Sequence, residues 1–262
     1  MLTVTIRGVA RTLTAIEYPG RPALLLRDQI SPNRAAPAAG PPGCGMRLHA
    51  GVTMDELGRA APLANRYLAM RHGQSQANVR GIIVSSIDAD RRGDFGLSAQ
   101  GREQVLAAAR GRGLPADTVI CSSDFARARQ TAEIVRGCLG AAAVVNAPAL
   151  RERFFGDFDG TPAANYAQVW AADAAASTAQ AGGPGHRVEP ARGVLDRAAG
   201  LVEELERRFR GRDILLVSHG DTLQILQAGF AGVDPARHRT VPHLEVAEIR
   251  PLRLAARPGQ LW

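Results

Sequence analysis

Hydrophobic residues in this chain gather in short runs that stop abruptly at polar residues. Residues 67–70, with the sequence YLAM, lead into Arg-His-Gly at 71–73, and residues 214–217, ILLV, lead into Ser-His-Gly at 218–220. Short apolar runs bounded in this way indicate buried strands, and open α/β sheets bind ligands at the carboxyl ends of their strands. The pattern therefore predicts two strands that each place a histidine at the same edge of one sheet.

Apolar residues elsewhere recur at the spacing of helices and alternate with further short runs. Ser98 is a candidate N-cap for a helix over 97–110, and residues 189–210 carry the apolar stripe of a long amphipathic helix. The other predicted helices cover 124–140, 163–176 and 221–230, and the other predicted strands cover 119–123, 143–146 and 243–252. This alternation predicts an α/β fold of three layers, in which helices cover both faces of a mainly parallel sheet.

Residues 1–65 differ from the remainder in composition. Residues 2–18 have a strand-like pattern, whereas residues 32–45 are so rich in proline, glycine and alanine that they predict a linker without packed structure. We therefore predict an amino-terminal extension over 1–65 and a folded domain over 66–262. Two hypotheses account for the extension: a genuine small appendage, or a translation start at one of the two methionines that follow the linker.

Composition excludes several classes of partner. The chain of 262 residues has a formal net charge of +7, and its 32 basic residues are all arginines. These arginines are scattered and aromatic residues make up only 5%, which disfavours nucleic acid as a partner. No apolar run approaches the roughly 20 residues of a membrane span, and the pattern of a signal peptide is lacking. With three cysteines and no CxxC motif, the sequence predicts a cytoplasmic protein without nucleic-acid or membrane partners, and leaves its oligomeric state open.

Four sequence blocks carry candidate chemistry: RHGQSQAN at 71–78, SSDFARARQTA at 122–132, LRERFFGDFDG at 150–160 and VSHGD at 217–221. In this order and spacing the blocks resemble those of the histidine phosphatase superfamily, the phosphoglycerate-mutase-like group. The third block is more similar to the phosphatase-type branch than to the mutases. The resemblance covers about 66–262 and implies a histidine phosphatase-like catalytic domain with a phosphoglycerate-mutase-like fold. It implies a phosphomonoester hydrolase that needs no cofactor and acts on a small phosphorylated metabolite.

His72 is the candidate nucleophile, because a neutral imidazole can attack phosphorus and hold the phosphoryl group as phosphohistidine until water removes it. Planar guanidinium groups match the charge that spreads over the phosphoryl oxygens. By resemblance, His219 is a further catalytic residue. The resemblance also implies that phosphate is bound by Arg71, Gly73, Asn78, Arg127 and His219.

Glu152 is the candidate acid for the leaving group, by its place in the third block. This role requires a raised pKa, for which burial or the arriving phosphate dianion would suffice. Asp221 is a weaker candidate, because Gly220 separates it from the second histidine of the site. A cationic His219 would help to keep the nucleophilic histidine neutral.

The remaining polar residues receive ordinary predictions. Arg153 is predicted to be a solvated residue, and His238 and His243, which belong to no block, are predicted to be structural or exposed. Substrate specificity is predicted to come from residues 80–96 and 161–190, since loops over the strand ends shape such pockets.

Three alternatives are weighed against the phosphatase prediction. A metal site built from His72, Glu152 and His219 is disfavoured, because converging arginines would repel a cation. A phosphoglycerate mutase, which uses the same site and returns the phosphoryl group to a bound intermediate, is the nearest enzymatic alternative. A non-catalytic phosphate-binding protein is disfavoured by the intact motifs.

Overall fold

The computed structural model of the chain falls into two units, Met1–Leu48 and His49–Trp262. In the first unit, β1 (Leu2–Ile6) and β2 (Val9–Leu13) form an antiparallel pair, in agreement with the strand-like pattern of the sequence. The predicted linker over 32–45 lies outside the described residues. The predicted domain boundary at 65/66 stays a prediction. The residues that the structure describes are 2–6, 9–13, 63–141, 143–175 and 187–255.

The second unit is built around a five-stranded sheet of order β5-β4-β6-β3-β7. Four of its strands are parallel, and β7 pairs antiparallel with β3 at one edge. This arrangement confirms the predicted α/β class with a mainly parallel sheet. The strands are β3 (Arg66–Arg71), β4 (Val119–Ser122), β5 (Val144–Asn146), β6 (Asp213–Ser218) and β7 (Ile249–Pro251).

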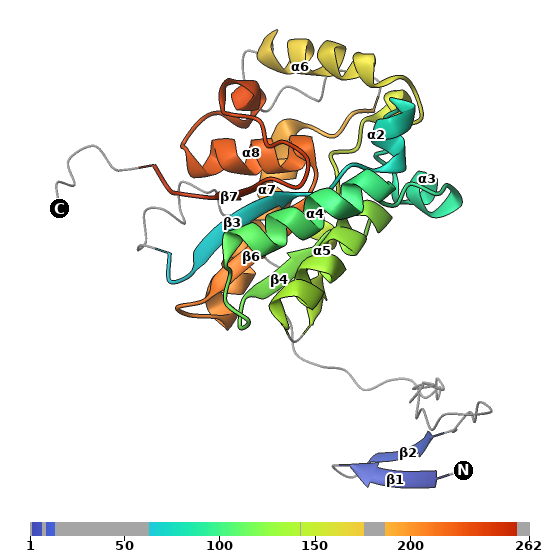
Figure 1. Ribbon diagram of the computed structural model, residues 1–262, viewed down its shortest axis with the longest axis vertical. Coiled ribbons are helices and arrows are strands. Elements are labelled where there is room, and N and C mark those ends of the chain that lie inside the picture. Colours follow the sequence, from blue (N-terminus) through green and yellow to red (C-terminus); the bar gives the residue numbers. More distant parts are fainter. Residues whose placement is uncertain (1, 7–8, 14–62, 142, 176–186, 256–262) are drawn as a thin grey trace, which may run out of the picture. The chain divides into compact units, whose positions relative to one another are not determined.

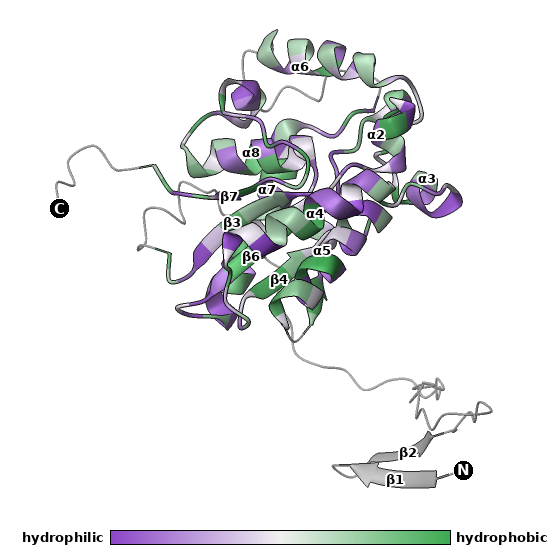
Figure 2. Ribbon diagram, in the orientation of Figure 1, coloured by the Kyte–Doolittle hydropathy of each residue, from purple (hydrophilic) through white to green (hydrophobic). Residues whose placement is uncertain are grey.

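Helices cover both faces of the sheet because alternate side chains of each strand enter two different cores. Tyr67 and Ala69 of β3 pack with α7 and α8, whereas Leu68 and Met70 pack with α4 and α5. Figure 1 shows these layers, and Figure 2 shows hydrophobic colour on the strands that the helices enclose. The covering helices are α4 (Ala99–Arg112), α5 (Ala126–Leu139), α7 (Ala191–Arg208) and α8 (Gly220–Phe230).

The helix ends follow the sequence signals. The Oγ atom of Ser98 accepts a hydrogen bond from the backbone N–H of Gly101 at 3.0 Å and caps α4, as predicted. Helix α5 ends at Gly140, which has a left-handed φ of 66° that favours glycine. The apolar stripe predicted over 189–210 is buried along one side of α7.

The predicted strand over 243–252 is wrong for most of its length, since only β7 at its end pairs with the sheet. Ala247 has a left-handed φ of 60°, which turns the chain before β7. Its N–H donates to the carbonyl oxygens of Arg71 and His72 at 3.1 and 3.2 Å. Leu244 and Ala247 are buried three residues apart, a spacing that belongs to a turn and not to a strand.

Short elements gather where the parallel strands end. Helix α6 supplies most of the predicted helix over 163–176, and the short helices α2 and α3 were not predicted. None of the described helices is long and apolar enough to cross a membrane. The elements are α2 (Gln76–Arg80), α3 (Ile87–Arg92), η1 (Pro148–Leu150), η2 (Gly156–Phe158), η3 (Ala163–Asn165), α6 (Tyr166–Ala175) and η4 (Pro235–Thr240).

Candidate active site

Two buried histidines lie side by side at the carboxyl ends of β3 and β6. The strands are parallel neighbours in which Arg71 pairs with Ser218, so the next residues, His72 and His219, face the same edge. Their ring centroids are 5.2 Å apart at an interplanar angle of 65°. The structure therefore brings the two predicted histidines together, as the sequence pattern requires.

His72 presents a lone pair on its Nε2 atom. Its Nδ1 lies 2.7 Å from the carbonyl oxygen of Gly73, which can only accept, so Nδ1 carries the proton. The Nε2 atom accepts a hydrogen bond of 3.1 Å from Nε of Arg127. Burial lowers the pKa of His72 well below its usual value, and the charges of Arg127 and Arg71 lower it further. The imidazole is therefore neutral, which is the form that a nucleophile needs.

Gly73 holds this histidine in place. Its N–H donates to Oγ1 of Thr131 at 3.2 Å, and its carbonyl accepts from the imidazole. A Cβ atom at position 73 would lie 2.5 Å from the carbonyl oxygen of Gly101 in α4, so only glycine fits this close approach. Gly73 does not line the cavity of the site. These contacts support a positioning role, and they give no support to its predicted contact with phosphate.

Two arginines, the buried Arg127 and the partly buried Arg71, flank the nucleophile. The Nη2 atom of Arg127, on α5, donates to the carbonyl oxygen of Val84 at 2.8 Å, and Nη1 lies 3.5 Å from Oδ1 of Asp90 on α3. Arg71, at the end of β3, has its Nη1 atom 2.7 Å from Nε2 of His243. Residues far apart in the sequence therefore fix both guanidinium groups around one point.

The site contains nitrogen atoms that are buried and have no hydrogen-bond partner within the described part of the chain. They are Nε of Arg71, Nη1 of Arg127, and the Nδ1 atoms of His219 and His243. Buried polar groups are nearly always paired, because an unpaired one costs about 1–3 kcal/mol. Two of these nitrogens are guanidinium donors, and Nδ1 of His243 is a donor because its Nε2 accepts from Arg71. Such a group of donors suits an anion with several oxygens.

Glu152 is buried and its Oε1 atom accepts all of the hydrogen bonds made to the carboxyl group within the described structure. The donors are the N–H of Arg153 at 2.9 Å, and the N–H and hydroxyl of Thr222 at 3.3 and 3.2 Å. Burial raises the pKa of Glu152, and the negative charge of Asp221 raises it further. Because Oε1 accepts these hydrogen bonds, the acid form of Glu152 carries its proton on Oε2, where it is free to be donated.

Asp221 has the opposite character although it is equally buried. Burial alone would raise its pKa, but hydrogen bonds and charges from His238, Arg153 and Trp170 outweigh this and lower the pKa to about 2. The pKa values of these two neighbouring carboxyl groups are therefore shifted in opposite directions, which is the pattern of an acid beside a fixed negative charge. The structure favours Glu152 over Asp221 as the proton donor.

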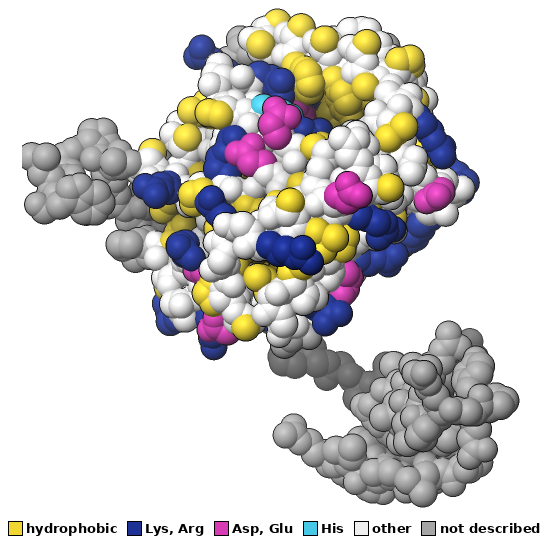
Figure 3. Space-filling model, in the orientation of Figure 1, with side chains coloured by type: hydrophobic (Ala, Val, Ile, Leu, Met, Phe, Trp, Pro, Cys, Tyr) yellow, Lys and Arg dark blue, Asp and Glu magenta, His cyan; other side chains and the backbone are white. Residues whose placement is uncertain are grey.

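A cavity of about 130 Å³ is lined by the two arginines, His72, Glu152 and Asp221. Asn78 lies on its wall, and the Oδ1 atom of that residue accepts from the N–H of Ser75 at 2.9 Å, which leaves the amide NH₂ available. Figure 3 shows charged side chains and a histidine beside a group of hydrophobic ones below α6. The remaining wall is mainly apolar and includes Ala77, Ile82, Val84, Ala163 and Tyr166.

One residue differs from its sequence prediction, whereas His238 and His243, predicted to be structural or exposed, make structural contacts. Arg153 is fully buried and paired with two aspartates, whereas a solvated residue was predicted. His243 contacts Arg71, and His238 is buried against Asp221. These partners lie far away in the sequence, so no local pattern reveals them.

The surroundings of His219 do not favour a cationic ring. Burial lowers its pKa well below the usual value, and the charge of Arg127 and the neighbouring His72 lower it further. Its Nε2 atom lies 2.9 Å from the hydroxyl of Ser123. Burial and the two arginines, and not a charged His219, favour the neutral form of the nucleophile. Among the residues that the structure describes, no three His, Cys, Asp or Glu side chains form a group that would hold a metal ion.

Comparison with known proteins agrees with this geometry. Residues 67–261 match the family described as the histidine phosphatase superfamily (branch 1). The chain belongs to this superfamily. A member from Mycolicibacterium vanbaalenii, glucosyl-3-phosphoglycerate phosphatase, is 31% identical over 178 residues, which are 64% of this chain and 75% of the relative. The metal-independent phosphoserine phosphatase of Arabidopsis thaliana is 26% identical over 174 residues, which are 62% of this chain and 69% of the relative.

A solved structure of a superfamily member shows the same fold. The mycobacterial glucosyl-3-phosphoglycerate phosphatase complexed with VO3 is 28% identical and has a TM-score of 0.58, covering 71% of this chain and 91% of its own. The predicted family and its phosphatase-type branch are thus confirmed, and so is the predicted fold. By these relationships the chain is a histidine phosphatase of the phosphoric monoester hydrolase class.

Proposed function

We propose that His72 is the nucleophile that hydrolyses small phosphomonoesters in this protein, with Glu152 as its acid and base. The observation that carries the proposal is the neutral, buried imidazole whose Nε2 lone pair lies 3.1 Å from a guanidinium group. The unpaired donors of Arg71 and Arg127 supply the charge that a phosphoryl group needs.

The first step transfers the phosphoryl group to the enzyme. The Nε2 lone pair of His72 attacks phosphorus in line, a new N–P bond forms, and the bond from phosphorus to the ester oxygen breaks. The oxygen leaves with the electron pair of that bond and takes the proton from Oε2 of Glu152, so a neutral alcohol departs. Arg71 and Arg127 donate to the oxygens of the moving phosphoryl group.

The second step regenerates the enzyme. Glu152 is now a carboxylate and removes a proton from a water molecule, whose oxygen attacks phosphorus as the N–P bond breaks. The electron pair returns to Nε2 of His72, and inorganic phosphate departs. Asn78 is positioned on the cavity wall as a further donor to phosphate, and His219 packs beside the nucleophile.

The substrate is proposed to be a small phosphorylated metabolite whose carbon skeleton lies against the apolar part of the cavity. Ile82 and Val84 belong to the predicted specificity segment 80–96, and Ala163 and Tyr166 belong to 161–190, so the cavity supports both predictions. Glucosyl-3-phosphoglycerate and phosphoserine enter a first screen because relatives are named for their hydrolysis.

Hydrolysis of p-nitrophenyl phosphate in the presence of EDTA tests the proposal. The wild-type protein is expected to release nitrophenol and phosphate in equal amounts, and His72→Ala is expected to lose the activity. Rapid quenching into alkali should recover phosphohistidine from wild type only. Activity that persists in His72→Ala would refute the nucleophile. Inactive wild type would favour a binding protein, and transfer to a second phosphorylated metabolite without release of phosphate would favour a mutase.

A further inference from the structure

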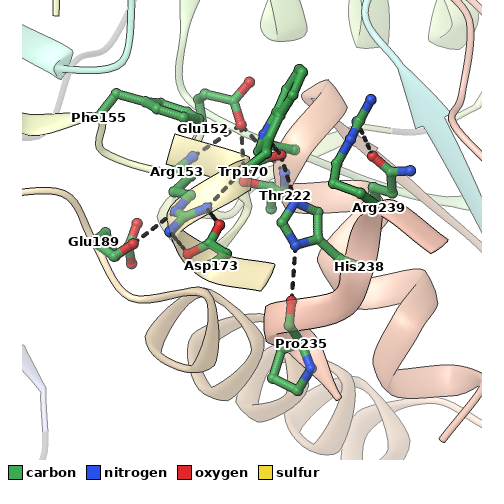
Figure 4. Close-up of polar contacts among 12 residues, drawn as sticks. Glu152, Arg153, Phe155, Trp170, Asp173, Glu189, Thr222, Pro235, His238 and Arg239 are labelled. Carbon is green, nitrogen blue, oxygen red and sulfur yellow. Dashed lines mark hydrogen bonds and ion pairs between the residues drawn. The ribbon is translucent and has the colours of Figure 1, made fainter. Parts of the chain in front are cut away.

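Four charged side chains form a buried network behind the cavity, with no solvent exposure above a few per cent (Figure 4). Arg153 donates to both carboxylate oxygens of Asp173 at 2.6 and 2.8 Å, and its Nη1 also lies 3.3 Å from Oδ2 of Asp221. Oδ1 of Asp221 lies 3.0 Å from Nε2 of His238 and accepts from Trp170 at 2.8 Å. The network therefore joins α6, α8, η4 and the segment that follows η1.

Both ring nitrogens of His238 lie within hydrogen-bond distance of an oxygen atom. Its Nδ1 atom lies 2.9 Å from the carbonyl oxygen of Pro235, which can only accept. Its Nε2 atom faces the carboxylate of Asp221, which also only accepts while it is ionised. Both ring nitrogens therefore face acceptors, an arrangement that a protonated ring satisfies with two donors. The network holds two cations and two anions, and this balance explains how four charges are buried together.

Glu152 is tied to the same network through two adjacent pairs of residues. Arg153 follows Glu152 in the chain, and Thr222 follows Asp221. Thr222 donates from its N–H and its hydroxyl to Oε1 of Glu152, while Arg153 binds Asp221. Glu152 and Asp221 both line the cavity. Neither carboxyl group can shift without straining the contacts made through Arg153 and Thr222.

We propose that Asp221 is a positioning residue for the acid step: through Arg153 and Thr222 it holds the carboxyl group of Glu152, its negative charge favours the acid form of that group, and it acts on the reaction only through Glu152. The inference rests on the proposed role of Glu152 as the acid. An ionised Asp221 has no proton to give, so it does not replace Glu152. Instead, it opposes the positive charges that would otherwise ionise Glu152 in the substrate-free site.

The charges that face Glu152 act in both directions. Arg127 and Arg71 favour its carboxylate form, whereas Asp221 favours its acid form, and the hydroxyl of Tyr166 is also close to it. Neutralising Asp221 leaves Arg153 paired with Asp173 alone and removes the anion that faces His238, and the resulting excess of positive charge favours the carboxylate form of Glu152. Neutralising His238 instead leaves an excess of negative charge and favours the acid form. The two changes are therefore expected to move the reaction in opposite directions.

The test compares Asp221→Asn and His238→Gln with wild type on two substrates across about pH 5 to 9. An alkyl monoester such as glycerol 2-phosphate needs a proton on its leaving group, whereas p-nitrophenyl phosphate does not. For the alkyl ester, Asp221→Asn should lower the ratio of kcat at about pH 8 to kcat at about pH 5.5 by about tenfold. His238→Gln should raise the same ratio, and neither change should much alter the corresponding ratio for the rate of the nitrophenol burst from p-nitrophenyl phosphate, which reports phosphoenzyme formation alone.

A merely structural role predicts a different result. It would lower kcat equally for both substrates at every pH, and that outcome would overturn the inference, as would shifts of the same sign in the two variants. If Asp221→Asn does not fold, His238→Gln still carries the sign test. Infrared difference spectra of carboxyl-labelled glutamate, with Glu152→Gln to assign the band, report protonation of Glu152 without turnover. Failure of the proposed function would appear separately, as retained activity in His72→Ala.

Discussion

The Nε atom of Arg127 donates to Nε2 of His72, the atom that is proposed to attack phosphorus. The guanidinium therefore covers the nucleophile and must turn its donor toward a phosphoryl oxygen when substrate arrives. Its other two nitrogens contact Val84 and Asp90, which keeps the group in place during that exchange. One arginine thus aligns the imidazole in the free site and stabilises charge in the transition state.

Replacing Arg127 should therefore damage kcat more than binding. Arg127→Lys keeps a positive charge but loses the planar fork that contacts three partners at once, so kcat should fall by about 100-fold or more. Steady-state kinetics on p-nitrophenyl phosphate measure the effect. Arg129→Ala, on an exposed position of the same helix, is the matched control and should retain wild-type kinetics. A normal kcat in the Arg127→Lys variant would contradict this account.

Gly73 offers a second test, because its contact with α4 leaves no space for a side chain. Gly73→Ala places a Cβ atom 2.5 Å from the backbone oxygen of Gly101, so the loop must move and the adjacent His72 with it. Both the unfolding free energy and kcat should fall. Gly137→Ala is the contrasting variant, since nothing lies within 4 Å of the added carbon on α5, and it should stabilise by up to about 1 kcal/mol. Urea unfolding measures the free energy of unfolding of both variants, and steady-state kinetics measure kcat. A Gly73→Ala variant with wild-type values of both would contradict this prediction.

The sequence is informative where local pattern controls the structure. Parallel strands end at one sheet edge, so the runs before His72 and His219 were enough to place the two rings together. Helix caps such as Ser98 follow from short-range chemistry. The role of Arg153 was missed because its partners lie 20 and 68 residues away, and only the folded chain shows that its charge is buried. The turn at Ala247 was missed because polar and apolar residues alternate over 243–246, as they do in a strand.

The two neutral histidines make stability depend on pH. Burial lowers the pKa of His72 and of His219 well below 6.5, so the unfolded chain takes up protons first as pH falls. The free energy of unfolding should decrease below about pH 6.5, because the unfolded state then binds more protons than the native state. Glu152 has the opposite effect on the free energy of unfolding. Its pKa is raised in the native state, so the native state binds this proton more tightly than the unfolded state does. Asp221, with a pKa of about 2, contributes no change in this range.

Urea titrations at about pH 7.5 and pH 5 measure this dependence. Wild type should lose stability between the two, and the double variant His72→Gln, His219→Gln should lose less, because neither position then titrates. Unfolding curves with equal slopes confirm that the comparison concerns stability alone. An identical pH dependence in the double variant would show that the two histidines are not its source.

The leaving group decides how much Glu152 matters. A nitrophenolate departs readily as an anion, whereas an alkoxide needs the proton that Oε2 of Glu152 is placed to give. Glu152→Gln should therefore lower kcat for an alkyl monoester by about 100-fold or more, and should have a smaller effect on formation of the phosphoenzyme from p-nitrophenyl phosphate. The carboxylate is also the proposed base for the second step, so the variant should accumulate phosphohistidine with p-nitrophenyl phosphate and give a burst of nitrophenol before slow turnover. Stopped-flow absorbance detects the burst, and a variant that slows both substrates equally without a burst would assign Glu152 a role outside proton transfer.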